Sequence, residues 1–160
     1  MKIHFKVNGV PAEVEASLDE MLLEVLHRDL DLRSVRATCG VGICGACTAL
    51  VNGEPISTCI FLAPLAGGCE ITTVEGLGGD HPVQRAFEAE HAFQCGYCIP
   101  GMILTIKALL EENPGPSEEE IKVALGGNLC RCGCYLKIIK AAKRATAAYS
   151  SGTEPCAGYI

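Results

Sequence analysis

The sequence predicts an α+β protein with a strand-rich amino-terminal half and a helical carboxy-terminal half. In residues 1–75 most signals are those of strands: residues 3–7 alternate apolar and polar side chains, and Asn-Gly pairs mark tight turns. From residue 82 onward, apolar residues recur every three or four positions, as in amphipathic helices. Residues 76–80 read Gly-Leu-Gly-Gly-Asp and are typical of a linker. We therefore expect two domains and a tail, at residues 1–76, 77–150 and 151–160.

The first half is expected to contain five short strands. Asn8-Gly9 and Asn52-Gly53 each favour a tight hairpin turn, because both residue types tolerate a left-handed backbone. Strands that surround a single helix predict a compact α+β unit. The strands are expected at residues 3–7, 10–16, 48–51, 56–60 and 70–74.

The helices are predicted from their start signals and their apolar faces. Residues 17–20 and 117–120 have the Ser-x-x-Glu spacing of a capping box. The first box is expected to open a helix that presents Leu22, Val25 and Leu26 on one face. Four short helices in the second half predict a small four-helix bundle. These helices are expected at residues 82–93, 100–112, 118–125 and 135–149.

Composition limits the class of protein. The chain has 160 residues and a net charge of -6, which argues against a nucleic-acid partner, because phosphate binding requires a basic face. There is no run of about 18 apolar residues, so no membrane span is expected. The first residues alternate like a strand and lack the apolar block of a signal peptide, so we expect a cytoplasmic protein.

The 11 cysteines are the unusual feature of the composition. Disulfide scaffolds are typically small and secreted, with an even number of cysteines. This chain is longer, has an odd count and carries no export signal. In a reducing compartment, clustered thiols more often hold metal, which is the interpretation we favour over disulfides.

The first cysteine set has the spacing C-x4-C-x2-C, followed by a fourth cysteine. This spacing is that of plant-type [2Fe–2S] proteins. A short loop that brings three thiolates to one cluster needs tight turns, and Gly40, Gly42 and Gly45 permit them. A structural zinc site is the alternative, but zinc usually uses two C-x2–4-C pairs and this set contains one. The expected ligands are Cys39, Cys44, Cys47 and Cys59.

The second cysteine set is ambiguous by itself. A C-x2-C pair followed by C-x-C could hold either zinc or an iron–sulfur cluster. Both pairs are expected near the start of a helix, where free N–H groups suit an anionic cluster. The expected ligands are Cys95, Cys98, Cys130 and Cys132.

Taken together, the two sets resemble the iron–sulfur subunit of the molybdenum hydroxylases, the family of xanthine dehydrogenase, aldehyde oxidoreductase and carbon monoxide dehydrogenase. The resemblance covers residues 2 to 148. It rests on three segments: Cys39 to Thr48 with Cys59, Gln94-Cys95-Gly96-Tyr97-Cys98-Ile99-Pro100-Gly101-Met102, and Gly127-Asn128-Leu129-Cys130-Arg131-Cys132.

The resemblance implies a ferredoxin-like β-grasp domain followed by a four-helix bundle, each with one [2Fe–2S] cluster. It implies a large partner subunit with molybdopterin, usually as the cytosine dinucleotide, and a medium partner subunit with FAD. Electrons would pass from the molybdopterin centre through the bundle cluster and then the amino-terminal cluster to FAD. Gln94 and Cys132 would lie against the pterin cofactor. The chain itself would contribute no catalytic residue.

One departure from the family lies at residues 130–135, Cys-Arg-Cys-Gly-Cys-Tyr, where the family usually has Cys-Arg-Cys-Thr-Gly-Tyr. Cys134 replaces the usual glycine, and we expect Gly133 to adopt the unusual backbone angle instead. A second departure is Ile99, which stands where Thr is commoner and which we interpret as a packing change. Cys134 could replace Cys132 as a ligand, but we favour Cys132 and expect Cys134 to pack as a small apolar group.

The remaining cysteines and the histidines are not expected to bind metal. We expect Cys69 to be a small buried apolar residue and Cys156 to be a free thiol. The four histidines share no ligand spacing with the cysteines. Two further functions stay open at this point: a free-standing ferredoxin-type carrier, which would need only the first half, and a zinc-stabilised interaction module.

Overall fold

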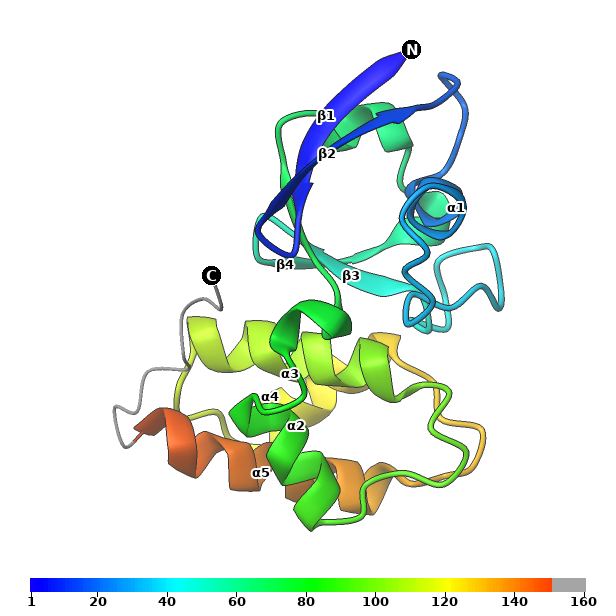
Figure 1. Cartoon of the computed structure of the whole chain (residues 1–160). Coiled ribbons are helices and arrows are strands. Elements are labelled where there is room, and N and C mark those ends of the chain that lie inside the picture. The colour runs from blue at the N-terminus through cyan, green and yellow to red at the C-terminus, as the bar shows by residue number, and fades with distance from the viewer. Residues whose placement is uncertain (151–160) are drawn as a thin grey trace.

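A computed structural model describes residues 1–150 as a sheet with one helix and, below it in Figure 1, a group of helices. The strands are β1 (Lys2–Val7), β2 (Val10–Glu15), β3 (Thr48–Val51), β4 (Glu54–Ser57) and β5 (Glu70–Thr72). The helices are α1 (Leu22–Arg28), α2 (Pro82–Ala89), α3 (Ile99–Glu112), α4 (Glu118–Ala124) and α5 (Tyr135–Ser150). Short 3-10 helices are η1 (Thr58–Ile60), η2 (Ala63–Ala66), η3 (Val74–Leu77) and η4 (Leu125–Gly127). The predicted α+β class is confirmed.

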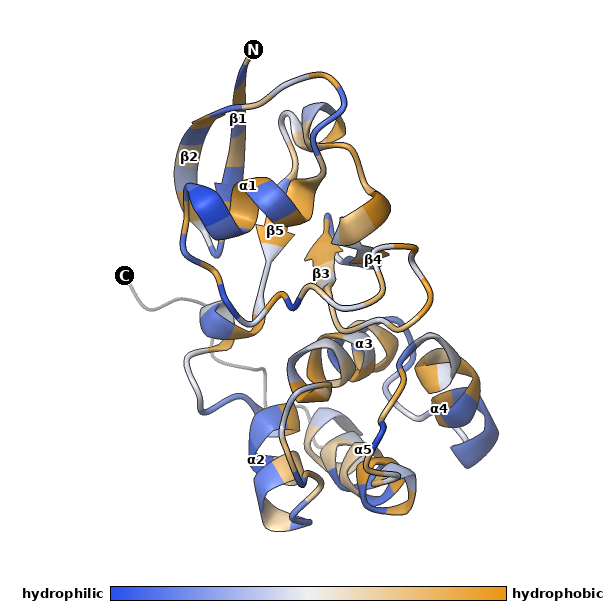
Figure 2. Ribbon diagram, turned by 90° about the vertical axis from the view of Figure 1, so that its right-hand side faces the viewer, coloured by the Kyte–Doolittle hydropathy of each residue, from blue (hydrophilic) through white to orange (hydrophobic). Residues whose placement is uncertain are grey.

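The sheet is mixed and has the strand order β2-β1-β5-β3-β4. Two antiparallel hairpins, β1–β2 and β3–β4, are joined by β5, which pairs parallel with β1 and antiparallel with β3. Helix α1 shares one hydrophobic core with the sheet, to which Leu22, Val25 and Leu26 contribute fully buried side chains. Figure 2 shows α1 lying across the strands. The predicted apolar face of this helix is therefore confirmed.

Both predicted hairpin turns are present. Asn8 and Gly9 have φ angles of +51° and +79°, and Asn52 and Gly53 have φ angles of +52° and +88°. Two consecutive left-handed residues fit the twist of an antiparallel hairpin, which explains why the Asn-Gly pair is favoured there.

Helix α1 starts at Leu22, which is later than expected, because the first capping box would open the helix directly after Ser17. Met21 has an extended backbone and forms an antiparallel bridge with Leu62. The Leu22 N–H donates to the Phe61 carbonyl at 2.8 Å, and the Ala63 N–H donates to the Glu20 carbonyl at 2.8 Å. A contact between residues 41 positions apart therefore holds the backbone extended where the local signal favours a helix.

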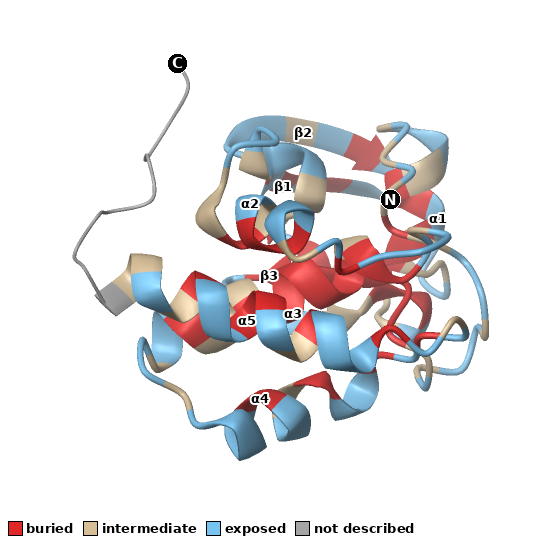
Figure 3. Ribbon diagram, turned by 90° about the horizontal axis from the view of Figure 1, so that it is seen from below, coloured by how far each residue is buried: buried red, intermediate tan, exposed pale blue. Residues whose placement is uncertain are grey.

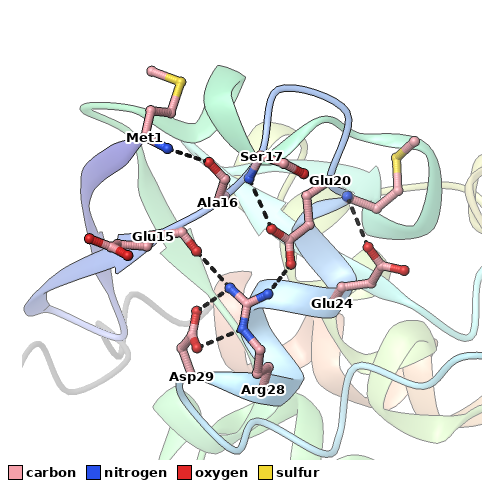
Figure 4. A network of polar contacts seen from close by, with 9 residues as sticks. Met1, Glu15, Ala16, Ser17, Glu20, Glu24, Arg28 and Asp29 are labelled. Carbon is pink, nitrogen blue, oxygen red and sulfur yellow. Dashed lines mark hydrogen bonds and ion pairs between the residues drawn. The ribbon is translucent and has the colours of Figure 1, made fainter.

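A polar network connects the end of β2 to α1 (Figure 4). Arg28 donates to the Glu15 carbonyl at 2.6 Å and pairs with Glu20 and Asp29. The Ser17 N–H donates to Glu20 at 3.1 Å, which is the backward half of the expected capping box without the helix. These contacts fix the turn between β2 and α1.

The helices of the second half share a separate hydrophobic core, contributed by α2, α3, α4 and α5. In Figure 3 each of these helices carries buried residues, and α3 also packs against β3 of the sheet. The second capping box is confirmed, since the Glu120 N–H donates to Ser117 Oγ at 3.2 Å and the Ser117 N–H donates to Glu120 at 2.7 Å. Helix α2 ends at Ala89 and not at residue 93, because His91 adopts a left-handed φ of +47°.

Two strands also end earlier than expected. The strand predicted at residues 56–60 is β4 (Glu54–Ser57), because η1 (Thr58–Ile60) turns the chain away from the sheet. The strand predicted at residues 70–74 ends at Thr72, and η3 begins at Val74. Among residues 1–150, no helix is long and apolar enough to cross a membrane.

Candidate iron–sulfur sites

The first cysteine set lies in the loop between α1 and β3 and in the turn after β4. Cys39, Cys44 and Cys47 belong to the loop, and Cys59 belongs to η1. The early end of β4 is what brings Cys59 to the loop, because η1 turns the chain there. Three glycines of the loop have φ angles between +64° and +74°, as expected for a chain that folds tightly around a cluster: Gly40, Gly42 and Gly45.

The four thiols of the first set form two neighbouring pairs. Cys39 lies beside Cys44, and backbone N–H groups of the loop, that of Val41 foremost, lower the pKa of Cys39 to about 6. Cys59 lies beside Cys47, and burial raises the pKa of Cys59 to about 11. The charge of Cys39 contributes to the raised pKa of Cys59, so the two pairs are within electrostatic reach of each other.

The second cysteine set forms two similar pairs. Cys95 lies beside Cys132, and the Tyr97 N–H is the largest cause that lowers the pKa of Cys95. Cys98 lies beside Cys130, and burial raises the pKa of Cys98 to about 12. In both sets, one thiol rests on backbone donors and one thiol is buried. A thiolate beside backbone N–H groups is stabilised by their hydrogen bonds. A buried thiolate without such donors needs a bound cation.

The second set lies at the starts of two helices, as expected. Cys98 is the residue that precedes α3, and Cys132 lies three positions before Tyr135, the first residue of α5. Burial by itself raises the pKa of Cys130, but its neighbours outweigh burial and the pKa is lowered. The foremost of these neighbours is the Cys134 N–H, which lies 3.5 Å from Cys130 Sγ. Free N–H groups at a helix start therefore point at a thiol of this set.

Gly133 takes the positive φ that the family's usual glycine would supply. Its φ is +75°, whereas Cys134 is not among the residues with a positive φ. The Cys134 side chain is buried, and burial raises the pKa of its thiol. Cys134 also contacts the side chains of Cys130 and Gln94. The expectation of a buried Cys134 is confirmed.

Gln94 and Cys132, the two residues expected near the pterin, lie together. Gln94 Nε2 donates to the Cys132 carbonyl at 3.5 Å, although 38 positions separate them. The Gln94 side chain is exposed. The structure therefore places the exposed Gln94 against the half-buried Cys132 of the second cysteine set.

Cys69, His4 and His81 have partners outside both cysteine sets. Cys69 is half-buried against the first core rather than fully buried, and its thiol lies 3.7 Å from the Leu65 carbonyl. Cys156 lies outside the described residues. His4 pairs with Glu13 at 3.5 Å, and His81 caps α2. The histidines with these contacts are thus satisfied by protein groups, as expected.

The two cysteine sets adjoin each other through contacts that local sequence signals do not reveal. The Leu129 N–H donates to the Cys44 carbonyl at 2.9 Å, which joins one ligand loop to the other. Arg36 donates to the Gly96 carbonyl at 2.9 Å and lies over the Tyr97 ring, 4.7 Å from its centroid. In the sequence, Leu129 belongs to the quoted segment at residues 127–132, which gave no indication of its contact with Cys44. Arg36 belongs to no motif, so the sequence did not predict its contacts.

The pairing of the thiols is the donor arrangement that a two-iron cluster requires. Each iron of a [2Fe–2S] cluster takes two thiolates, whereas a four-cysteine zinc site needs four around one ion. Within the part of the chain that the structure describes, no group of three or more His, Cys, Asp or Glu side chains surrounds a single-ion position.

Two protein-family models match the chain, one for each half. A 2Fe-2S iron-sulfur cluster binding domain matches residues 5–65, and a [2Fe-2S] binding domain matches residues 73–143. Two cluster-binding segments in one chain define an iron–sulfur electron-transfer protein with two [2Fe–2S] clusters. The zinc module is excluded by these matches.

Several similar proteins are components of oxidoreductases. A nicotinate dehydrogenase subunit of Pseudomonas putida is 50% identical over 148 residues, which are 89% of this chain and 93% of that protein. The small FeS subunit of nicotinate dehydrogenase from Eubacterium barkeri is 46% identical over 146 residues, with the same coverage of 89% and 93%. The crystal structure of quinoline 2-oxidoreductase from Pseudomonas putida matches with a TM-score of 0.89 at 38% identity, over 95% of this chain and 97% of that one.

The chain belongs to the iron–sulfur subunits of the molybdenum hydroxylase family. It is the electron-transfer subunit of a multi-subunit oxidoreductase. The alternative of a free-standing ferredoxin is therefore not supported.

Proposed function

We propose that the eight paired thiols are the cluster ligands. Cys39, Cys44, Cys47 and Cys59 hold the first cluster, and Cys95, Cys98, Cys130 and Cys132 hold the second. The support is the grouping of each set into two neighbouring pairs, with a second pair within electrostatic reach of the first. A bound [2Fe–2S] cluster accepts and releases one electron at a time.

Each cluster is proposed to have its own domain. The ferredoxin-like β-grasp domain would comprise residues 1–76, the helical domain residues 77–150, and the tail residues 151–160. The support is that the buried apolar residues divide into one core from Ile3 to Ile71 and another from Val83 to Ala145. The helices α2, α3, α4 and α5, which share the second core, are proposed to form a four-helix bundle.

The second cluster is proposed to receive electrons from the molybdopterin centre and to pass them to the first cluster. Gln94 and Cys132 would contact the pterin, which we expect as the cytosine dinucleotide. The contact between the exposed Gln94 side chain and the half-buried Cys132 supports this direction. The first cluster would then reduce FAD on a medium partner subunit, and the complex would work in the cytoplasm.

The substrate class is proposed to be an N-heteroaromatic compound of the pyridine type, as distinct from a purine. The support is that relatives with 50% and 46% identity are named nicotinate dehydrogenase subunits. Adding nicotinate without oxygen to the purified complex should bleach its iron–sulfur absorbance, and adding hypoxanthine or an aldehyde should not. Bleaching by an aldehyde and not by nicotinate would reject this substrate class.

The observation that carries the electron-transfer function is the direct contact between the two ligand loops, the 2.9 Å hydrogen bond from Leu129 to Cys44. Clusters held by adjoining loops can exchange electrons within one chain. Metal analysis of the purified complex should find four irons and four sulfides per chain, since each cluster contains two of each. An EPR-monitored redox titration should resolve two signals, because the two surroundings differ. Stoichiometric zinc, or a single signal of one spin, would contradict the proposal.

A further inference from the structure

Asn128 is a buried polar residue of the second half whose side chain reaches the first ligand loop. It is 4% exposed and lies two positions before Cys130. Its Nδ2 donates to the Gly45 carbonyl at 3.1 Å, and its Oδ1 accepts from Thr105 Oγ1 at 3.0 Å. A carbonyl can only accept, so the nitrogen of the carboxamide must face Gly45.

The Gly45 carbonyl is held by three donors. Besides Asn128, the Thr48 N–H donates at 3.2 Å and Thr48 Oγ1 donates at 2.8 Å. Gly45 lies between the expected ligands Cys44 and Cys47, so these donors fix the orientation of one peptide unit inside the first ligand loop.

The other end of this peptide unit is the Ala46 N–H. In a planar trans peptide the N–H points away from the carbonyl, so the Ala46 N–H points away from Asn128. Ala46 is 5% exposed, and no oxygen of residues 1–150 accepts from its N–H. A buried N–H requires an acceptor, and cluster or thiolate sulfur is the acceptor that this loop would provide.

The contact around Asn128 leaves no free space. A Cβ on Gly45 would lie 2.3 Å from the Gly127 carbonyl oxygen and 2.4 Å from Asn128 Nδ2. A Cβ on Gly101, in α3, would lie 2.3 Å from the Gly45 carbonyl oxygen. Because backbone meets backbone here, the Gly45 peptide cannot rotate freely, and a change at Asn128 must be felt by the first loop.

We propose that Asn128 is a positioning residue for the first cluster, although it belongs to the loop that holds the second. Its hydrogen bond to Gly45 aims the Ala46 N–H at the first cluster and thereby helps to set the reduction potential of that cluster. Hydrogen bonds to sulfur favour the more negative, reduced state. The inference rests on the proposed ligand assignment.

The test is an EPR-monitored redox titration of the purified complex. Asn128→Leu removes the donor without adding charge, and Asn128→Asp removes it and adds a negative charge. Thr48→Val removes a donor to the same carbonyl from within the first half. Asn52→Asp, in the β3–β4 turn, is the matched control for charge in the first half. The signal that remains in Cys130→Ala identifies the first cluster.

All three substitutions at Asn128 and Thr48 should shift the first cluster to a lower potential, and Asn52→Asp should leave it unchanged. A shift in Asn128→Asp but not in Asn128→Leu would overturn the inference, since charge would then explain it. A first-cluster potential that stays unchanged in Thr48→Val would overturn it as well, even if the Asn128 variants do not fold. Variants that keep four irons per chain and show unchanged potentials would reject only the positioning role of Asn128. Fewer than four irons per chain in the unaltered complex would reject the ligand assignment.

Discussion

At the residue scale, the surroundings of Cys130 and Cys134 decide which of these two chemically identical thiols binds iron. Cys130 and Cys134 are both buried, and the Cys134 N–H points at Cys130 Sγ from 3.5 Å. Each of Cys95 and Cys98 already has a neighbouring thiol, Cys132 and Cys130 respectively. A fifth thiol has no vacant iron site, so we expect Cys134 to pack beside the cluster without binding it.

Replacing Cys130 and replacing Cys134 should therefore have different effects. Cys130→Ala should lower the iron content from four to two per chain and remove one EPR signal, because a two-iron cluster needs four thiolates. Cys134→Ala should keep four irons and both signals, with a loss of stability of about 1 kcal/mol from the small cavity. Iron analysis and EPR of the two purified complexes measure both outcomes. Loss of the second cluster in Cys134→Ala, with retention in Cys132→Ala, would show that Cys134 is the ligand.

At the scale of the element, loops and helix starts hold the two sites in place. The first ligand loop folds back through glycines in left-handed conformations, and Gly45 among them also touches the second half. The second set depends on the starts of α3 and α5, where backbone N–H groups are free. Helix α2 starts at a histidine cap, His81, which accepts from the Val83 N–H at 3.3 Å and contacts the Tyr149 hydroxyl at 3.3 Å.

Gly45→Ala should disturb both ligand loops. The added Cβ would be strained at a φ of +64° and would collide with the Gly127 carbonyl at 2.3 Å. We expect a loss of about 2–3 kcal/mol and a lower iron content, from the backbone strain together with overpacking. Gly9→Ala is the matched control, because Gly9 has a φ of +79° but open space around it. Equal thermal midpoints and iron contents in the two variants would contradict the role of the contact.

The stability of the helical half should decrease in mild acid because of His81. Burial lowers the pKa of His81, and Lys107 adds to this effect while Glu111 opposes it. A lowered folded-state pKa means that the unfolded chain binds the proton more readily. The contribution is therefore present above the ordinary value of 6.5 and is lost as the pH falls toward the folded-state pKa.

A series of thermal midpoints between about pH 7.5 and pH 5.5, around the ordinary pKa of histidine, measures this loss. His81→Asn should flatten the pH dependence, because Asn caps a helix without titrating. His91→Asn is the control, since His91 is exposed and Asn tolerates its left-handed φ of +47°. A steep dependence that persists in His81→Asn would assign the effect to other groups.

At the scale of the whole molecule, the chain places two cluster sites next to each other and exposes apolar side chains beside the second one. Phe93, Leu129 and Leu136 are 45%, 52% and 82% exposed, and they lie next to the second cysteine set in sequence. Exposed apolar residues near a functional site are typical of a protein interface. The large molybdopterin-binding subunit is the partner that such a surface would contact.

The chain should consequently depend on its partner. Expressed alone, it should aggregate or lose iron, since the exposed apolar residues would then remain in water. Leu136→Glu should weaken co-purification with the large subunit by about tenfold, which corresponds to about 1.4 kcal/mol, and should leave the iron content unchanged. Val123→Glu, at a residue of α4 that is 74% exposed, should have no effect. A chain that remains monomeric and fully loaded with iron when expressed alone would refute this dependence.

The sequence by itself determined the features that depend on neighbours along the chain. The spacing of Cys39, Cys44 and Cys47, the Asn-Gly turns and the helical periodicity all follow from local backbone geometry, and they led to the α+β class and to the two clusters. Only the tertiary structure decided which distant segments meet. The bridge between Met21 and Leu62 delays α1, the early end of β4 carries Cys59 to its loop, and Leu129 and Asn128 reach the loop of the other site. Such contacts result from the packing of whole elements, so neither periodicity nor cysteine spacing reveals them, even where the residue itself lies in a predicted motif.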